Sequence, residues 1–373
     1  MRHAVYNSEY QWGFLQPSMN LSLFDSIGVK AADELALQMS SLIKQKCFRK
    51  ELLKLTPFDF NSIPEDQLPR VKMMLGMLAQ AFVWCNGEDE KTHYVPESIA
   101  IPLVGVSARL KEPPILNYAD YILRNTQLKI PEMVHPALFK SVYTFTGMKS
   151  EFGFILSHIL YELKGREAIQ VGLKALSAAV NHEEETTGIA LTELYVIILD
   201  LIEQFNTVHK TTKEEDFREH FRVFLKGWKS IIPDMTYRGV SINAGELRGE
   251  TGAQSSLLPF LDGVIGVSNT LMQHSSLYHA WRPYMPEADR LFLSDIGFLG
   301  EKLREFVRMN TMLIDAYNKV LISLMDFRKN HLMTITQYIE GKNSKVFDGI
   351  GTGGTFYSTY LNGLIAHLQT LLL

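Results

Sequence analysis

A long apolar stripe near the C-terminus constrains the fold of this chain more than any other feature of its sequence. Between residues 313 and 338, apolar side chains recur every three or four positions, and that spacing places them on one face of a single helix. One position of the stripe is His331, whose imidazole needs a partner because an unsatisfied buried polar group costs free energy. The stripe consists of Leu313, Tyr317, Val320, Leu324, Phe327, His331, Ile335 and Tyr338.

The same helical periodicity runs through most of the chain. The alternation of polar and apolar residues that marks strands is nearly absent, apart from a short extended piece near residues 237–242. The pattern therefore predicts an all-α protein, with a large helical bundle and a smaller N-terminal helical unit. The predicted helices cover roughly residues 27–45, 66–84, 137–145, 152–182, 188–208, 214–230, 254–275, 300–340 and 356–372.

Two proline-containing stretches suggest where the chain divides. Pro96 to Pro102 and Pro113-Pro114 favour extended backbone and interrupt helices. We therefore expect a small N-terminal helical unit over residues 1–115 and a main helical domain over residues 116–373. The main domain ends with a glycine-rich loop, Gly351-Thr352-Gly353-Gly354-Thr355.

Composition excludes several classes of partner. The chain has 37 basic and 41 acidic residues without a basic cluster, so we expect no nucleic-acid binding. Its two cysteines, Cys47 and Cys85, lie far apart and form no zinc or haem-attachment motif, which favours a reducing, cytoplasmic location. The N-terminus lacks a signal-peptide pattern, and charges interrupt apolar stretches such as residues 196–202, so no membrane span is expected.

His331 has two interpretations. It is either a core histidine satisfied by a carbonyl or hydroxyl group, which the spacing alone favours, or a neutral imidazole that ligates haem iron. Arg328, one turn earlier, is either a surface arginine or a partner for a cofactor carboxylate. The glycine-rich loop lacks the lysine of a phosphate-binding loop and follows no strand, so it fits a turn or a mobile, closely approached backbone better.

Two further residues are candidates for chemistry. His158 shares one helix face with Phe154 in a strongly apolar segment, where a lone histidine is more often core than catalytic. Arg222 lies in an aromatic segment, where a basic side chain usually extends to solvent; an inward guanidinium would instead bind a carboxylate. The sequence has no GxSxG, no HExxH and no repeated ExxH pair, which argues against serine hydrolases, zinc proteases and di-iron bundles.

Several short motifs in a fixed order make the chain resemble the indoleamine 2,3-dioxygenase family. These are haem proteins that insert both atoms of dioxygen across the indole C2–C3 bond of tryptophan. The resemblance runs from about residue 100 to the C-terminus, and the first hundred residues match poorly. It rests on IPLVGVS at 101–107, PPILNYAD at 113–120, FLKGWK at 224–229, GAQSS at 252–256, RPYMP at 282–286, Arg328 to His331, and GTGGT at 351–355.

The resemblance implies haem b, held without a covalent bond, as the cofactor. His331 would be its proximal iron ligand. Arg328 would pair with a haem propionate, and Asp262 would support that arginine. Thr251 belongs to the same cofactor-binding group of residues.

The resemblance also implies a substrate site on the other side of the haem. Tyr118, Phe154 and Phe217 would form apolar walls around the indole, since stacking holds a planar aromatic ring. Arg222 would bind the substrate carboxylate. Thr352 would lie in a loop that closes near the substrate ammonium and keeps water out.

The chain departs from the family pattern at two places. His158 stands where the mammalian-type enzymes have a serine; it would contact the indole nitrogen, as the distal histidine of the related tryptophan 2,3-dioxygenases does, or relay protons to bound peroxide. Gly249-Glu250-Thr251 replaces a Gly-Gly-Ser pattern, and the carboxylate of Glu250 would alter which amino acid or indole is accepted.

The leading hypothesis is a haem-dependent dioxygenase that opens the indole ring of tryptophan or a related indole, with His158 as a catalytic residue. One alternative is a haem peroxygenase or monooxygenase that hydroxylates an aromatic amino acid or indole derivative. Another is a haem protein that binds or senses gas without catalysis. The expected partners are a small indole or aromatic amino acid and dioxygen, and the sequence leaves the oligomeric state open.

Overall fold

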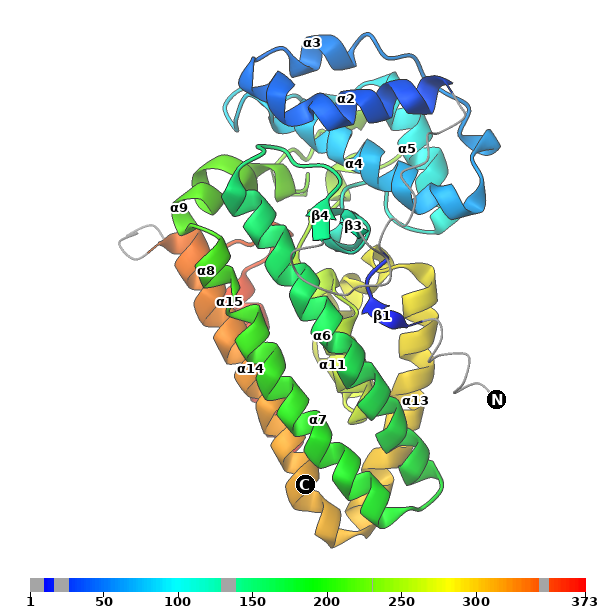
Figure 1. Cartoon of the computed structure of the whole chain (residues 1–373), viewed down its shortest axis with the longest axis vertical. Helices are drawn as coiled ribbons and strands as arrows, with labels where there is room; N and C mark the ends of the chain where they lie inside the picture. The colour runs from blue at the N-terminus through cyan, green and yellow to red at the C-terminus, as the bar shows by residue number, and fades with distance from the viewer. Residues whose placement is uncertain (1–9, 17–26, 129–138, 230, 342–348) are drawn as a thin grey trace.

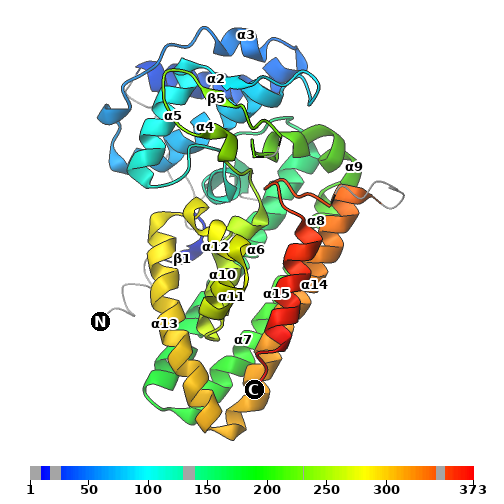
Figure 2. The same cartoon turned by 180° about the vertical axis from the view of Figure 1, so that it is seen from behind.

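Four long helices form the body of the molecule and lie side by side along its longest axis (Figure 1). The computed structural model describes residues 10–16, 27–128, 139–229, 231–341 and 349–373. Three shorter helices complete the bundle (Figure 2). The long helices are α6 (Lys149–Val180), α7 (Glu184–Phe205), α13 (Glu287–Met309) and α14 (Ile314–Glu340), and the shorter ones are α10 (Leu257–Val264), α11 (Ser268–His274) and α15 (Tyr357–Gln369). The all-α prediction is confirmed.

The apolar stripe lies along α14 and faces the bundle, as predicted. Tyr317, Val320 and Leu324 are fully buried, and the Tyr317 hydroxyl donates to the Ile265 carbonyl at 2.7 Å. His331, one of the last three positions of the stripe, is only partly buried because it borders a cavity. The first half of the stripe is therefore packed in the core, and its second half lines a cavity.

A second group of helices covers one end of the bundle (Figures 1 and 2). It consists of α2 (Ile27–Lys44), α3 (Phe48–Leu52), α4 (Leu68–Trp84) and α5 (Glu97–Leu110). In this group β2 (Tyr94–Val95) pairs in parallel with β5 (Thr236–Tyr237), so a segment from the second half of the chain enters the N-terminal unit. The domain boundary near residue 115 stays a prediction.

Three of the predicted helices are divided in the structure. The stretch 300–340 holds the end of α13 and all of α14, with extended backbone at Asn310 between them. The stretch 254–275 holds α10 and α11, which are separated at Gly266, where a φ of +68° favours glycine. The stretch 214–230 holds α9 (Glu214–Asp216), a π-helical turn over Phe217–Phe221 and a 3-10 turn over Arg222–Leu225.

Other stretches differ from the predicted pattern, and α3 and the first half of α13 were not predicted. The helix over 137–145 is wrong, because β4 (Phe139–Ser141) pairs antiparallel with β3 (Thr126–Leu128); residues 137 and 138 lie outside the described residues. Conversely, α5 was not predicted, since its prolines indicated an interruption. Pro96 only precedes the helix, and the burial of its apolar face offsets the backbone hydrogen bond that Pro102 cannot make.

Two short elements complete the fold. β1 (Gln11–Phe14) lies against α6, and α12 (Ser276–Ala280) follows α11. None of the helices in the described residues combines the length and apolarity that a membrane span requires.

Candidate functional site

A cavity lies inside the bundle, between α6 and α14. Its empty volume is about 1350 Å³, counting the part that opens to solvent. Residues 250–255, α15 and the glycine-rich loop complete its wall. Most of the lining is apolar or aromatic: Phe154, Phe205, Val208, Phe217, Leu225, Leu258, Pro259, Met285, Ile335, Tyr338, Ile339, Leu361 and Leu364. The cavity therefore offers a mostly apolar surface, which suits a flat aromatic ligand.

His331 presents its imidazole to this cavity from α14. The ring contacts Phe205 and Phe327, with centroid distances of 5.3 and 6.4 Å, and makes no hydrogen bond or ion pair with any described residue. Burial, together with the nearby His158 and Arg328, lowers the pKa of His331 to about 4. The ring is therefore neutral near pH 7 and keeps a nitrogen lone pair available for a metal.

One turn before His331, a buried ion pair stands in the cavity wall. Nη2 of Arg328 donates to Oδ2 of Asp262 at 2.6 Å, and both side chains are almost completely buried. The Tyr278 hydroxyl donates to the same carboxylate oxygen at 2.8 Å, whereas Oδ1 of Asp262 has no partner in the described part of the chain. The pair fixes a guanidinium beside His331, where it can meet an anionic group in the cavity.

His158 faces the cavity from α6. Its Nδ1 lies 2.8 Å from the carbonyl oxygen of Phe154; a carbonyl only accepts, so Nδ1 carries the proton and donates. Burial lowers the pKa of His158 to about 4, so the ring is neutral and Nε2 remains an acceptor. Phe205 contacts both imidazoles, with centroids 6.3 Å from His158 and 5.3 Å from His331, so the two histidines border one cavity.

An aromatic wall surrounds His158. The Phe154 ring lies 4.3 Å from the imidazole, centroid to centroid, and stacks on Phe217 at 5.3 Å. Phe217 in turn meets Tyr338 of α14 edge to face at 5.7 Å. The structure thus brings together two of the three predicted aromatic wall residues, and they present flat apolar surface to the cavity.

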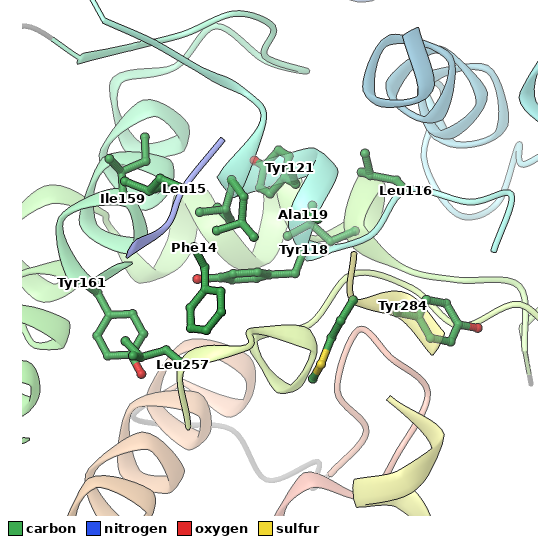
Figure 3. Close-up of a cluster of buried hydrophobic side chains, with 14 of the residues drawn as sticks. Phe14, Leu15, Leu116, Tyr118, Ala119, Tyr121, Ile159, Tyr161, Leu257 and Tyr284 are labelled. Atoms are coloured by element: carbon green, nitrogen blue, oxygen red, sulfur yellow. The ribbon is translucent and has the colours of Figure 1, made fainter. Parts of the chain in front are cut away.

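Tyr118, the third predicted wall residue, lies behind this wall and is not part of the cavity lining. Its ring is 6.1 Å from that of His158 and sits in the core cluster with Phe14 and Tyr161 (Figure 3). Its hydroxyl donates to Oε1 of Glu162 at 2.9 Å, and burial raises the pKa of that carboxyl to about 7. Tyr118 therefore supports His158 from the core.

The glycine-rich loop closes over the cavity and contacts Arg222. Nη2 of Arg222 donates to the Ile350 carbonyl at 2.7 Å, and the hydroxyl of Thr352 donates to the backbone carbonyl of Glu250. Gly354 has a φ of +74°, which favours glycine there. Thr352 lines the cavity, whereas Arg222 lies just outside the lining and holds the loop.

Residues 250 and 251 bring polar groups into the wall. The Thr251 hydroxyl accepts a hydrogen bond from the Ala253 amide at 3.4 Å and so caps a 3-10 turn. Glu250 is 3% exposed, and its carboxylate has no hydrogen-bond or ion-pair partner among the residues that the structure describes. Burial raises the pKa of Glu250 to about 8.

Much of the lining was not predicted from the sequence, and Phe205 and Trp281 are two examples. Phe205 is the last residue of α7, and nothing in its spacing singles it out from the other apolar residues of that helix. Trp281 lines the cavity next to the loop, and a Cβ at Gly353 would lie 2.6 Å from its ring. The RPYMP motif directly follows Trp281 and was the one available signal for this region.

Known proteins resemble the chain over almost its whole length. A family model described as indoleamine 2,3-dioxygenase matches residues 2–348, so the likeness includes the first hundred residues. Indoleamine 2,3-dioxygenase 2 of Mus musculus is 27% identical over 378 residues, 96% of this chain and 92% of the relative. Indoleamine 2,3-dioxygenase 1 of the same species is 29% identical over 353 residues, with 88% and 86% covered. A 6-hydroxytryptophan 2,3-dioxygenase of Fusarium equiseti is 26% identical over 372 residues, with 96% and 89% covered.

Proposed function

The chain belongs to the indoleamine 2,3-dioxygenase family of haem-dependent dioxygenases, and we propose that the cavity between α6 and α14 is its catalytic site. The enzyme opens the ring of an indole with dioxygen and uses haem b as its cofactor. Tryptophan is the substrate proposed first, and a ring-substituted tryptophan is the next candidate, because one relative is named for 6-hydroxytryptophan.

The observation that carries this assignment is the neutral imidazole of His331, which faces the cavity without a protein partner. An axial haem ligand needs this protonation state and this freedom from other bonds. When bound, the haem supplies the iron that binds and activates dioxygen. Arg328 would hold a propionate of the haem, with Asp262 keeping the guanidinium in place, and Thr251 would stand at the rim of the same group.

On the substrate side, His158 would accept the indole N–H through Nε2. The hydrogen bond from Nδ1 to the Phe154 carbonyl fixes the tautomer that this role requires. Phe154 and Phe217 would hold the indole plane by stacking. Tyr118 would act from behind, as a support for His158.

At the far end of the substrate, Arg222 would bind the carboxylate. The guanidinium already donates to a carbonyl of the glycine-rich loop, so closure of the loop and binding of the carboxylate would use the same side chain. Thr352 would close near the substrate ammonium. A closed loop keeps water from the reacting atoms.

A product assay separates this function from its rivals. Haem-loaded, reduced protein is mixed with L-tryptophan and dioxygen, and N-formylkynurenine is the expected product. A singly oxygenated indole would instead support a peroxygenase or monooxygenase with His158 as proton relay. Haem binding without any indole turnover would support a gas-binding protein.

A binding measurement on the same protein tests the placement of the substrate. The ferrous protein is titrated with L-tryptophan under carbon monoxide, and a shift of the Soret band is expected because the proposed site would bring the indole next to the cofactor. A constant spectrum would contradict the shared cavity. Cys47 and Cys85 are free thiols, and a reducing cytoplasm stays the proposed location.

A further inference from the structure

Glu250 places an unpartnered carboxyl group in the wall of the cavity. The residue is 3% exposed and lines the cavity, and no described residue donates a hydrogen bond or an ion pair to its side chain. A buried carboxyl group without a partner either loses the free energy of hydration or holds its proton, so a cationic ligand that reaches it completes the site. The space that Glu250 borders is the cavity.

None of the described cationic side chains pairs with the carboxyl group of Glu250. Burial is the one cause that shifts its pKa, which rises to about 8. The groups that respond to its charge are the buried phenols Tyr118 and Tyr121, whose pKa values rise in part because of it. Arg328 is engaged by Asp262. A cation that meets Glu250 must therefore come from the ligand.

The position of Glu250 relative to the glycine-rich loop indicates which group of the ligand carries this positive charge. The backbone carbonyl of Glu250 accepts from Thr352, and two residues earlier the Ile350 carbonyl accepts from Arg222. The loop therefore contacts both the backbone of Glu250, which lines the cavity, and the guanidinium of Arg222, which lies just outside the lining. An α-amino acid carries the complementary pair, an ammonium and a carboxylate on one carbon atom.

We propose that Glu250 receives the α-ammonium of the substrate and thereby selects free amino acids over indoles that lack an amino group. The proposal rests on the proposed function, because it assumes that an indole amino acid enters this cavity. Glu250 and Arg222 together recognise the zwitterion, and the aromatic wall recognises the ring. The raised pKa agrees with this role, since an arriving ammonium favours the ionised carboxylate that the empty cavity disfavours.

The test compares two ligands that differ only in the amino group. L-Tryptophan and indole-3-propionate share the ring, the chain length and the carboxylate. In the haem-loaded enzyme, Glu250→Gln keeps the shape of the side chain and removes its charge. We expect KM for L-tryptophan to rise about 10- to 100-fold, while the Ki of indole-3-propionate as a competitive inhibitor stays unchanged.

Glu246→Gln is the matched control. Glu246 lies four residues away in the same segment, is exposed and pairs with Lys229 at 2.6 Å, so its replacement is expected to alter neither constant. Glu250→Ala provides a second variant that removes the carboxyl group altogether, and it is expected to show the same selective loss.

The outcomes are distinct. An equal change of both constants, or no change, would overturn the role of Glu250 while tryptophan turnover by the wild type upholds the proposed function. A fall in kcat for L-tryptophan at unchanged KM would also overturn it, because it would make Glu250 a proton donor or acceptor. A wild type that neither binds nor oxidises L-tryptophan would overturn the proposed function and this inference together.

Discussion

The cavity has two sides that are built in different ways. On the α14 side, His331 and Arg328 project from a regular helix of 27 residues, and Asp262 of α10 neutralises the arginine. On the loop side, Arg222 stands on a 3-10 turn, and Glu250 and Thr352 lie on segments without regular structure. The helical side is thus a platform fixed by backbone hydrogen bonds and an ion pair, whereas the loop side has no regular framework of this kind.

The difference in charge pairing follows the same division. The guanidinium of Arg328 is held by a carboxylate at 2.6 Å. On this side only His331 still needs a partner, namely the group that it would ligate. Glu250 has no partner in the described residues. A side whose charges are already paired suits a cofactor that stays bound, whereas an unpaired carboxyl group suits a substrate that binds and dissociates in each turnover. The following changes test the two sides separately.

The largest effect is expected from the platform. His331→Ala removes the imidazole that we propose as the proximal ligand, so the variant should fail to retain haem and should lose the Soret band, and with it all turnover. The exposed His279 on α12 is the control, since His279→Ala should retain haem in full. Full haem uptake by His331→Ala, measured by absorption after gel filtration, would contradict the assignment of the ligand.

Asp262→Ala tests how much the buried ion pair between Asp262 and Arg328 stabilises the helical side. The substitution leaves the Arg328 guanidinium buried and without its carboxylate, and breaking such a pair costs about 3–5 kcal/mol of unfolding free energy. Asp315→Ala removes the partner of Lys319 in an exposed pair on the same helix, where the loss should be below about 1 kcal/mol. If both variants lost the same unfolding free energy in urea, burial of the Asp262–Arg328 pair would add nothing to its contribution to stability.

The two sides also differ in how far the sequence predicts them. The periodicity of α14 fixes which residues share its inner face, so His331 and Arg328 could be located from spacing and family motifs alone. Arg222 was assigned from a motif, but the predicted helix over 214–230 gives way to π and 3-10 turns that no period reveals. Tyr118 was expected in the wall, yet its hydroxyl bonds to Glu162 and holds the ring in the core. That bond depends on tertiary packing, which spacing does not report.

Arg222→Ala tests the loop side. Losing a charged hydrogen bond to the substrate carboxylate should cost about 1.5–3 kcal/mol, or one to two orders of magnitude in KM for L-tryptophan. Tryptamine lacks the carboxylate, so its KM should change far less, even if the contact of Arg222 with Ile350 loosens the loop. A loss that is equal for both amines would mean that Arg222 acts only by holding the loop.

The smallest expected effect concerns His158, which lies between the two sides. Burial lowers its pKa to about 4, below the usual value of about 6.5 in an unfolded chain. Between these values the unfolded state binds more protons, so this residue makes the folded protein less stable as the pH falls from about 6.5 toward 4.

His158→Leu removes this loss of stability at low pH. In the haem-free protein, the unfolding free energy of the variant relative to wild type should therefore rise by on the order of 1–2 kcal/mol between pH 7 and pH 5. His331 titrates in both proteins, so its contribution cancels in this difference except for the part of its pKa shift that His158 itself causes. A relative stability that stays constant over this range would mean that the His158 ring is not neutral and buried, and Nε2 would then not be the acceptor that the indole N–H requires.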